Sequence, residues 1–128
     1  MRKFIGEFTI DEQMPGLNDI IRASKTHWAT YAKMKTKYTD LACEAAFHIR
    51  AAKGKIMLHI EWHEPKDGRR DPDNIWVSKK FILDGLICAG VIPDDNKNCV
   101  YGVSDVTCYD MPSKQFRVDV EVYELGGH

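Results

Sequence analysis

The sequence of 128 residues lacks several features that mark particular classes of protein. It has no apolar run approaching the roughly 18 residues that span a bilayer. Its first ten residues alternate with charges and leave no apolar signal core. Its formal net charge of −1 argues against a uniformly basic nucleic-acid-binding protein. We therefore expect one cytoplasmic domain over residues 1–128, large enough to bury its own core.

The cysteines also lack a pattern. Four are present, without a CxxC pair and without the spacing of zinc ligands: Cys43, Cys88, Cys99 and Cys108. Aromatic residues make up 10% of the chain, so a core does not require disulfides. We predict reduced, mostly buried thiols.

Charge is unevenly distributed along the chain. From Ile20 to Lys55 eight basic residues accompany two acidic ones, whereas the segment from Tyr101 onward has five acids and two bases. This asymmetry fits a local basic surface. A solvated helix face explains it equally well, so the pattern does not decide between them.

Apolar periodicity predicts four strands and two helical regions. The strands are expected near Phe4–Ile10, Ile56–His63, Cys99–Tyr109 and Phe116–Glu124. The first strand places Phe4, Phe8 and Ile10 on one side. A long helical region follows the N-cap Asn18 and runs to about Ala52, with Gly54 as its stop.

The second helix is expected over Asn74–Ala89, closed by Gly90, after a loop over Glu64–Pro72. In the strand Ile56–His63, alternate residues from Ile56 to Trp62 face one way. The resulting order is β-α-β-α-β-β. We predict a single α+β domain with a mixed sheet packed by two helices.

Acidic residues concentrate within Arg69–Asn74. Asp71 and Asp73 flank a proline, which favours an extended Asp71 and can direct both carboxylates to one side. Neighbouring carboxylates repel each other unless a proton or cation intervenes, and Mg²⁺ prefers carboxylate oxygens. Helix capping by Asp-Pro-Asp is the alternative interpretation.

A second acidic pair, Asp94-Asp95, comes one helix length later. On a continuous helix Lys80 would share a stripe with Asp73 and Asp84. Turn chemistry also explains Asp94-Asp95. The combination of carboxylates, an in-line lysine and a preceding Arg-Arg favours a metal-dependent enzyme that acts on a phosphate backbone.

Three motifs resemble those of RusA-like Holliday junction resolvases. They are Arg70-Asp71-Pro72-Asp73-Asn74, the helix segment Lys80-Phe81-Ile82-Leu83-Asp84-Gly85-Leu86, and Ala89-Gly90-Val91-Ile92-Pro93-Asp94-Asp95. The segment Pro15–Asn18 is similar to the family's N-terminal Pro-x-x-Asn element. The resemblance covers nearly the whole chain.

This resemblance implies a homodimeric, Mg²⁺-dependent endonuclease that cuts four-way DNA junctions by paired symmetric nicks, with Mn²⁺ able to substitute. It assigns metal binding and catalysis to Asp71, Asp73 and Asp95. It also implies a role in recombination and repair, in the cytoplasm of a bacterial or phage-infected cell.

The family's catalytic lysine is assigned to Lys80, with Lys79 as the alternate. Counting from Asp73-Asn74 would place that lysine at Val77, whereas counting back from Asp84-Gly85-Leu86 places it at Lys80. The spacing after Asp-Asn is therefore about three residues longer than in the family pattern. The candidates for phosphate contacts are all basic: Arg69, Arg70, Lys79, Lys33, Lys35 and Lys37.

Aromatic and histidine residues allow weaker hypotheses. Trp76, Trp28 and Tyr31 could stack on opened bases, but we favour core packing for each. His59 and His63 share a strand face with Glu61, where a mixed polar surface is the simpler interpretation and a functional pair the alternative. Two other functions stay open for the whole chain: a DNA-binding module without catalysis, and a nuclease for other branched DNA.

Overall fold

The computed structural model describes residues 1–126 and contains four strands and four helices. In chain order they are β1 (Arg2–Ile10), α1 (Leu17–Thr26), α2 (Trp28–Ala46), β2 (Ile56–Pro65), α3 (Pro72–Trp76), α4 (Lys79–Cys88), β3 (Val100–Met111) and β4 (Arg117–Leu125). The predicted α+β class is confirmed.

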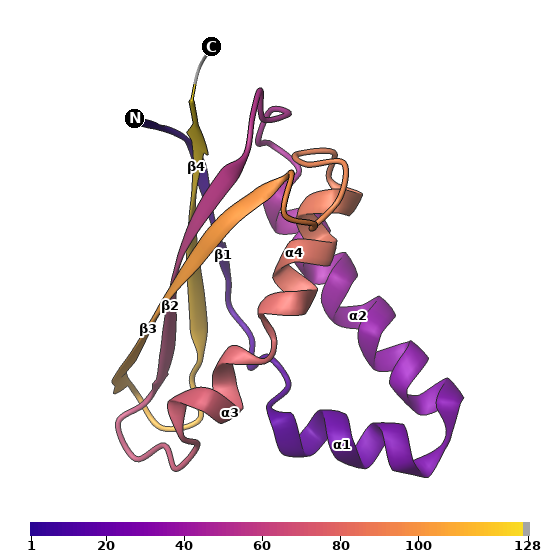
Figure 1. Cartoon of the computed structure of the whole chain (residues 1–128). Coiled ribbons are helices and arrows are strands. Elements are labelled where there is room, and N and C mark those ends of the chain that lie inside the picture. Colours follow the sequence, from indigo (N-terminus) through magenta and orange to yellow (C-terminus); the bar gives the residue numbers. More distant parts are fainter. Residues whose placement is uncertain (127–128) are drawn as a thin grey trace.

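The four strands form one mixed sheet in the order β1-β4-β2-β3. β2 pairs in parallel with β3, whereas β4 pairs antiparallel with both β1 and β2. All four helices lie on one side of the sheet (Figure 1). Within residues 1–126 no helix covers the other face, which we call the outer face.

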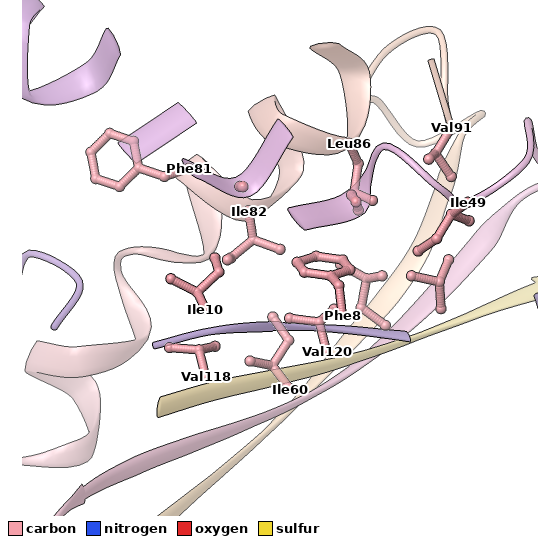
Figure 2. Close-up of a cluster of buried hydrophobic side chains, with 14 of the residues drawn as sticks. Phe8, Ile10, Ile49, Ile60, Phe81, Ile82, Leu86, Val91, Val118 and Val120 are labelled. Carbon is pink, nitrogen blue, oxygen red and sulfur yellow. The ribbon is translucent and has the colours of Figure 1, made fainter. Parts of the chain in front are cut away.

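The core lies between the sheet and the helices. The predicted inward residues of β2 are fully buried from Ile56 to Trp62, and the valines of β4 join them. Figure 2 shows Ile60, Val118 and Val120 from the strands directed toward the α4 side chains Ile82 and Leu86. α4 approaches α2 so closely that a Cβ on Gly85 would lie 2.3 Å from the Cβ of Ala42.

The first predicted helix is wrong in its length and its start. The predicted helix divides at His27, where the backbone is extended. The His27 side chain caps α2, because its Nδ1 accepts a hydrogen bond from the Ala29 amide at 3.1 Å. α1 begins after Gly16, so Asn18 lies inside the first turn and is not the N-cap. α2 ends at Ala46 rather than Ala52, because a turn then directs Ile49 onto β1.

The second predicted helix also consists of two parts. α3 and α4 are separated at Val77-Ser78, where the buried Ser78 hydroxyl donates to the Pro15 carbonyl. The cap at Gly90 is confirmed: its φ is +78°, and the amide of Val91 donates to the Leu86 carbonyl at 3.0 Å.

Two strand details differ from prediction. A bulge between Phe4 and Gly6 reverses the alternation of β1, so Phe4 packs beside Tyr123 and away from Phe8 and Ile10. β2 continues to Pro65, two residues into the predicted loop, because Glu64 is buried against Arg70. No helix within the described residues is long and apolar enough to cross a membrane.

Candidate metal and nucleic-acid site

Two motif segments far apart in the sequence meet at one corner of the fold. Arg70 donates to the Met14 carbonyl at 2.9 Å, and the Leu17 amide donates to the Asn74 side chain at 2.5 Å. Gly16 is required here, since a Cβ would lie 2.5 Å from the Asn74 oxygen. We call Met14–Leu17 together with Arg70–Ser78 the motif corner. It links the Pro-x-x-Asn element to the Asp-x-Asp-Asn motif.

Asp71 and Asp73 stand exposed on the motif corner. Asp71 is the N-cap residue of α3 with an extended backbone, as predicted from Pro72, yet its side chain does not cap the helix. Within residues 1–126 neither carboxylate takes part in a hydrogen bond or an ion pair.

Burial and the charges of Glu64 and Asp71 raise the pKa of Tyr109, whose hydroxyl donates to the Arg70 carbonyl. The loop before Asp71 is thereby fixed to β3.

The acidic pair after α4 divides into two roles. Asp94 accepts from the Asp95 amide at 2.7 Å and from the Asn96 side chain at 3.1 Å. Asp94 therefore performs the turn chemistry that the sequence offered as an alternative. The exposed Asp95 side chain is left available for another ligand.

The structure does not bring Asp71, Asp73 and Asp95 into one metal-sized group. Groups of three acidic, histidine or cysteine donors lying within 4.8 Å of one another occur elsewhere in the described chain. Asp95 lies in the loop that follows α4, and its charge contributes to the raised pKa of Lys80 at the start of that helix. Within residues 1–126 a single copy of the chain therefore does not hold the three predicted acids as a preformed three-ligand group.

The two candidate lysines have different partners. The Lys80 amine donates to the Tyr31 hydroxyl at 2.8 Å. This bond raises the pKa of Lys80, and the charges of Asp84 and Asp95 add to the effect while burial opposes it. Lys79 instead pairs with the carboxylate of Asp105. The predicted stripe of Asp73, Lys80 and Asp84 does not lie on one helix, because the break at Val77-Ser78 intervenes.

The predicted phosphate-binding residues also fall into two groups. Arg70 forms a fork with Glu64, at 3.0 and 2.8 Å, with side-chain exposures of only 17% and 5%. Its guanidinium therefore supports the motif corner. Arg69 is exposed, as are three lysines on α2: Lys33, Lys35 and Lys37. α1 runs from the neighbourhood of α3 to the beginning of α2 (Figure 1), so it connects these two regions.

The predicted core packing of the three aromatic residues is confirmed for Trp76 but not for Trp28 or Tyr31. Trp28 is 77% exposed at the start of α2. Trp76 is half-buried and donates to the Thr107 hydroxyl at 2.9 Å, while Tyr31 is held by Lys80. Trp28 is therefore the residue with a surface free for stacking.

The cysteine prediction is partly wrong. All four thiols are free, but Cys88 is exposed and the other three are half-buried. Burial, followed by a hydrogen bond with Cys88, raises the pKa of Cys43 to about 11. Cys43 is consequently a poor nucleophile at neutral pH.

Sequence reasoning missed a cluster on the outer face. Glu61, His63, Asp110 and Asp119 meet there from three strands, and we call them the sheet-face cluster. Alternation along β2 already pairs Glu61 with His63, but Asp110 and Asp119 join them only through the registers of β3 and β4. The strand pairing needed to find them is not encoded in local periodicity.

No protein-family model matches the chain, and no curated protein matches it either.

Proposed function

We propose that the protein is a Mg²⁺-dependent endodeoxyribonuclease that resolves four-way DNA junctions by paired symmetric nicks. The observation that carries the proposal is the motif corner. It holds Asp71 and Asp73 exposed and without ionic partners on a loop fixed by Arg70, Asn74 and Ser78. Unpaired carboxylates on a rigid support are what a hard cation requires. The motif resemblance supplies the substrate and the setting, the cytoplasm of a bacterial or phage-infected cell.

Oxygen ligands fit Mg²⁺, and Mn²⁺ can replace it at such ligands. When bound, the ion supplies a Lewis acid that activates water and stabilises charge at the leaving 3′ oxygen. Asp71 and Asp73 would hold it. Lys80, kept protonated by Tyr31, would stabilise negative charge on the phosphate, and Lys79 is the alternate for this role.

The charge distribution supports DNA binding on the helical side. The exposed basic residues Arg69, Lys33, Lys35 and Lys37 lie there, whereas the outer face carries acids such as Glu61, Asp119 and Glu121. Phosphates would therefore be attracted to the helices and repelled from the outer face. Arg70 contributes indirectly, by fixing the loop.

The position of Asp95 supports a homodimer in which two copies complete each site. Within the described part of one copy, Asp71, Asp73 and Asp95 do not form a group of donors within 4.8 Å. We infer that Asp95 of a second copy supplies the third carboxylate. Two such sites, related by two-fold symmetry, would suit a junction with near two-fold symmetry.

The test is cleavage of a synthetic mobile four-way junction, with a linear duplex and a flap as comparison substrates. We expect symmetric nicks on the junction with Mg²⁺, none with EDTA, and loss of cleavage by at least about 100-fold in Asp73→Asn with junction binding retained. The matched control is Asp67→Asn, an exposed acid of the same loop, which should cleave normally.

Two results would replace the proposal. Tight junction binding without cleavage under any divalent metal would leave a DNA-binding module in which Asp94 serves as a turn residue and Asp71 and Asp73 have no catalytic role. Preferential cleavage of the flap would assign the protein to other branched DNA.

A further inference from the structure

His63 is buried on a face of the sheet that no helix covers. It is 6% exposed although it points away from the core, because side chains from β2, β3 and β4 surround it. The preceding and following residues, Trp62 and Glu64, face the helical side, so His63 lies opposite the Glu64–Arg70 pair. This location separates it from the motif corner.

The contacts of the His63 ring determine which nitrogen carries the hydrogen. Nδ1 lies 2.9 and 3.1 Å from the two carboxylate oxygens of Asp110. An ionised carboxylate only accepts hydrogen bonds, so Nδ1 donates. In the neutral ring Nε2 then presents a lone pair.

That Nε2 atom is buried and has no hydrogen-bond partner among the described residues. It nevertheless faces two further acceptors, an oxygen of Asp119 at 3.2 Å and an oxygen of Glu61 at 3.4 Å. Their angles do not suit a hydrogen bond, although their distances suit an ion pair. A lone pair directed at two carboxylates is unfavourable, and either a proton on Nε2 or a bound cation between the three groups relieves it.

The spacing suits a metal ion. Ligand atoms about 2.0–2.2 Å from a tetrahedral zinc ion lie roughly 3.4 Å from one another. The two separations from Nε2 match this value, and all three donor atoms lie within 4.8 Å. The Asp110 carboxylate orients the buried His63 imidazole, as carboxylates commonly do for metal-binding histidines.

We propose that Glu61, His63 and Asp119 bind a divalent transition metal of the zinc type. One imidazole nitrogen with two carboxylates suits Zn²⁺, whereas Mg²⁺ prefers oxygen ligands alone. A polar depression of about 410 Å³ is lined in part by Glu61 and Asp119, so an ion can approach these two ligands from solvent. Asp110 is a positioning residue.

Other groups facing the site set its affinity. Arg117 donates to the same Asp119 oxygen at 3.1 Å, and Thr9 donates to the other oxygen at 2.8 Å. His59 lies 3.3 Å from the second oxygen of Glu61. Arg117 therefore competes with the ion, while the three acids leave a net negative charge that attracts it.

The experiment is calorimetric titration of the whole chain with Zn²⁺ and, separately, Mg²⁺, after removal of metal with a chelator. We expect one Zn²⁺ site that His63→Asn weakens by more than about 100-fold and Asp110→Asn by about 10–100-fold. Arg117→Gln should increase the Zn²⁺ affinity, because it removes the cation that competes for Asp119. Misfolding cannot produce such a gain. Asp73→Asn should leave it unchanged, which separates this site from the nuclease proposal.

Cobalt substitution tests the ligand set. His63, Cys108 and Asp110 form a second possible group within 4.8 Å. The proposed oxygen and nitrogen ligands give Co²⁺ no thiolate charge-transfer band. A band that disappears in Cys108→Ser would overturn the assignment, as would Zn²⁺ binding that His63→Asn leaves intact, or no Zn²⁺ binding at all.

Discussion

The motif corner and the sheet-face cluster both gather acidic side chains, but they do so in opposite ways. The corner presents Asp71 and Asp73 exposed and unpaired, two residues apart in the chain. The cluster surrounds a buried histidine with acids from three strands. The first arrangement offers oxygen atoms to a hard cation, and the second offers a nitrogen as well. Acids that are close in the sequence and acids that are brought together by the fold would thus suit different metals.

Mixing two inactive variants tests the comparison most strongly. If Asp95 acts in a second copy, a heterodimer of Asp73→Asn and Asp95→Asn chains contains one site with all its acids and one site lacking two. We expect nicking of one strand to return from near zero, measured on a labelled junction after the variants are mixed. No recovery, despite heterodimers shown by native mass spectrometry, would mean that Asp95 acts within its own chain.

The next effect concerns the rigidity of the motif corner. Arg70→Gln leaves the buried Glu64 carboxylate without its partner, so we expect a loss of about 3–5 kcal/mol in the free energy of unfolding. Arg69→Gln is the matched control and should change stability by no more than about 0.5 kcal/mol. The Arg69→Gln variant should instead reduce by about 1 the slope of the logarithm of the junction-binding constant against the logarithm of the salt concentration. Urea unfolding and binding at several salt concentrations measure both, and equal stability of the two variants would contradict the assignment.

The smallest effect concerns Glu124, an acid of β4 that lies outside the sheet-face cluster and forms an ion pair with Arg50. The Arg50 guanidinium, followed by the Lys53 amide, lowers the pKa of Glu124 from 4.5 to about 2. A lowered folded-state pKa stabilises the protein above pH 4.5, and this contribution is lost as pH falls from 4.5 towards 2. Glu124→Gln should flatten the dependence of stability on pH in that window, as should Arg50→Gln. An unchanged slope in urea unfolding would contradict the pairing.

Much of the fold could be predicted because local patterns determine it. Alternating apolar residues identified β2 and β4, and Gly90 marked the end of α4. The breaks at His27 and Val77-Ser78 could not be predicted, since they depend on a cap and on a contact with Pro15. The bulge after Phe4 has one local signal, the glycine at position 6, which accommodates the close approach of Ile49.

The candidate site was predictable in part for the same reason. The acids of the motif corner are adjacent in the chain, so their grouping is visible in the sequence. The partners of Arg70 and Lys79 were not, because Glu64 and Asp105 are brought to them by strand pairing and helix packing. Asp110 and Asp119 required the sheet registers, which are tertiary information.

The bonds that build the motif corner join positions 56 to 63 residues apart. Closing so long a loop carries an entropic cost before any contact is gained, so such contacts form late in folding. The acids would consequently acquire their fixed geometry only once the segment after β1 has reached α3. A metal site built on these acids would thus be absent from newly made chains until these contacts have formed.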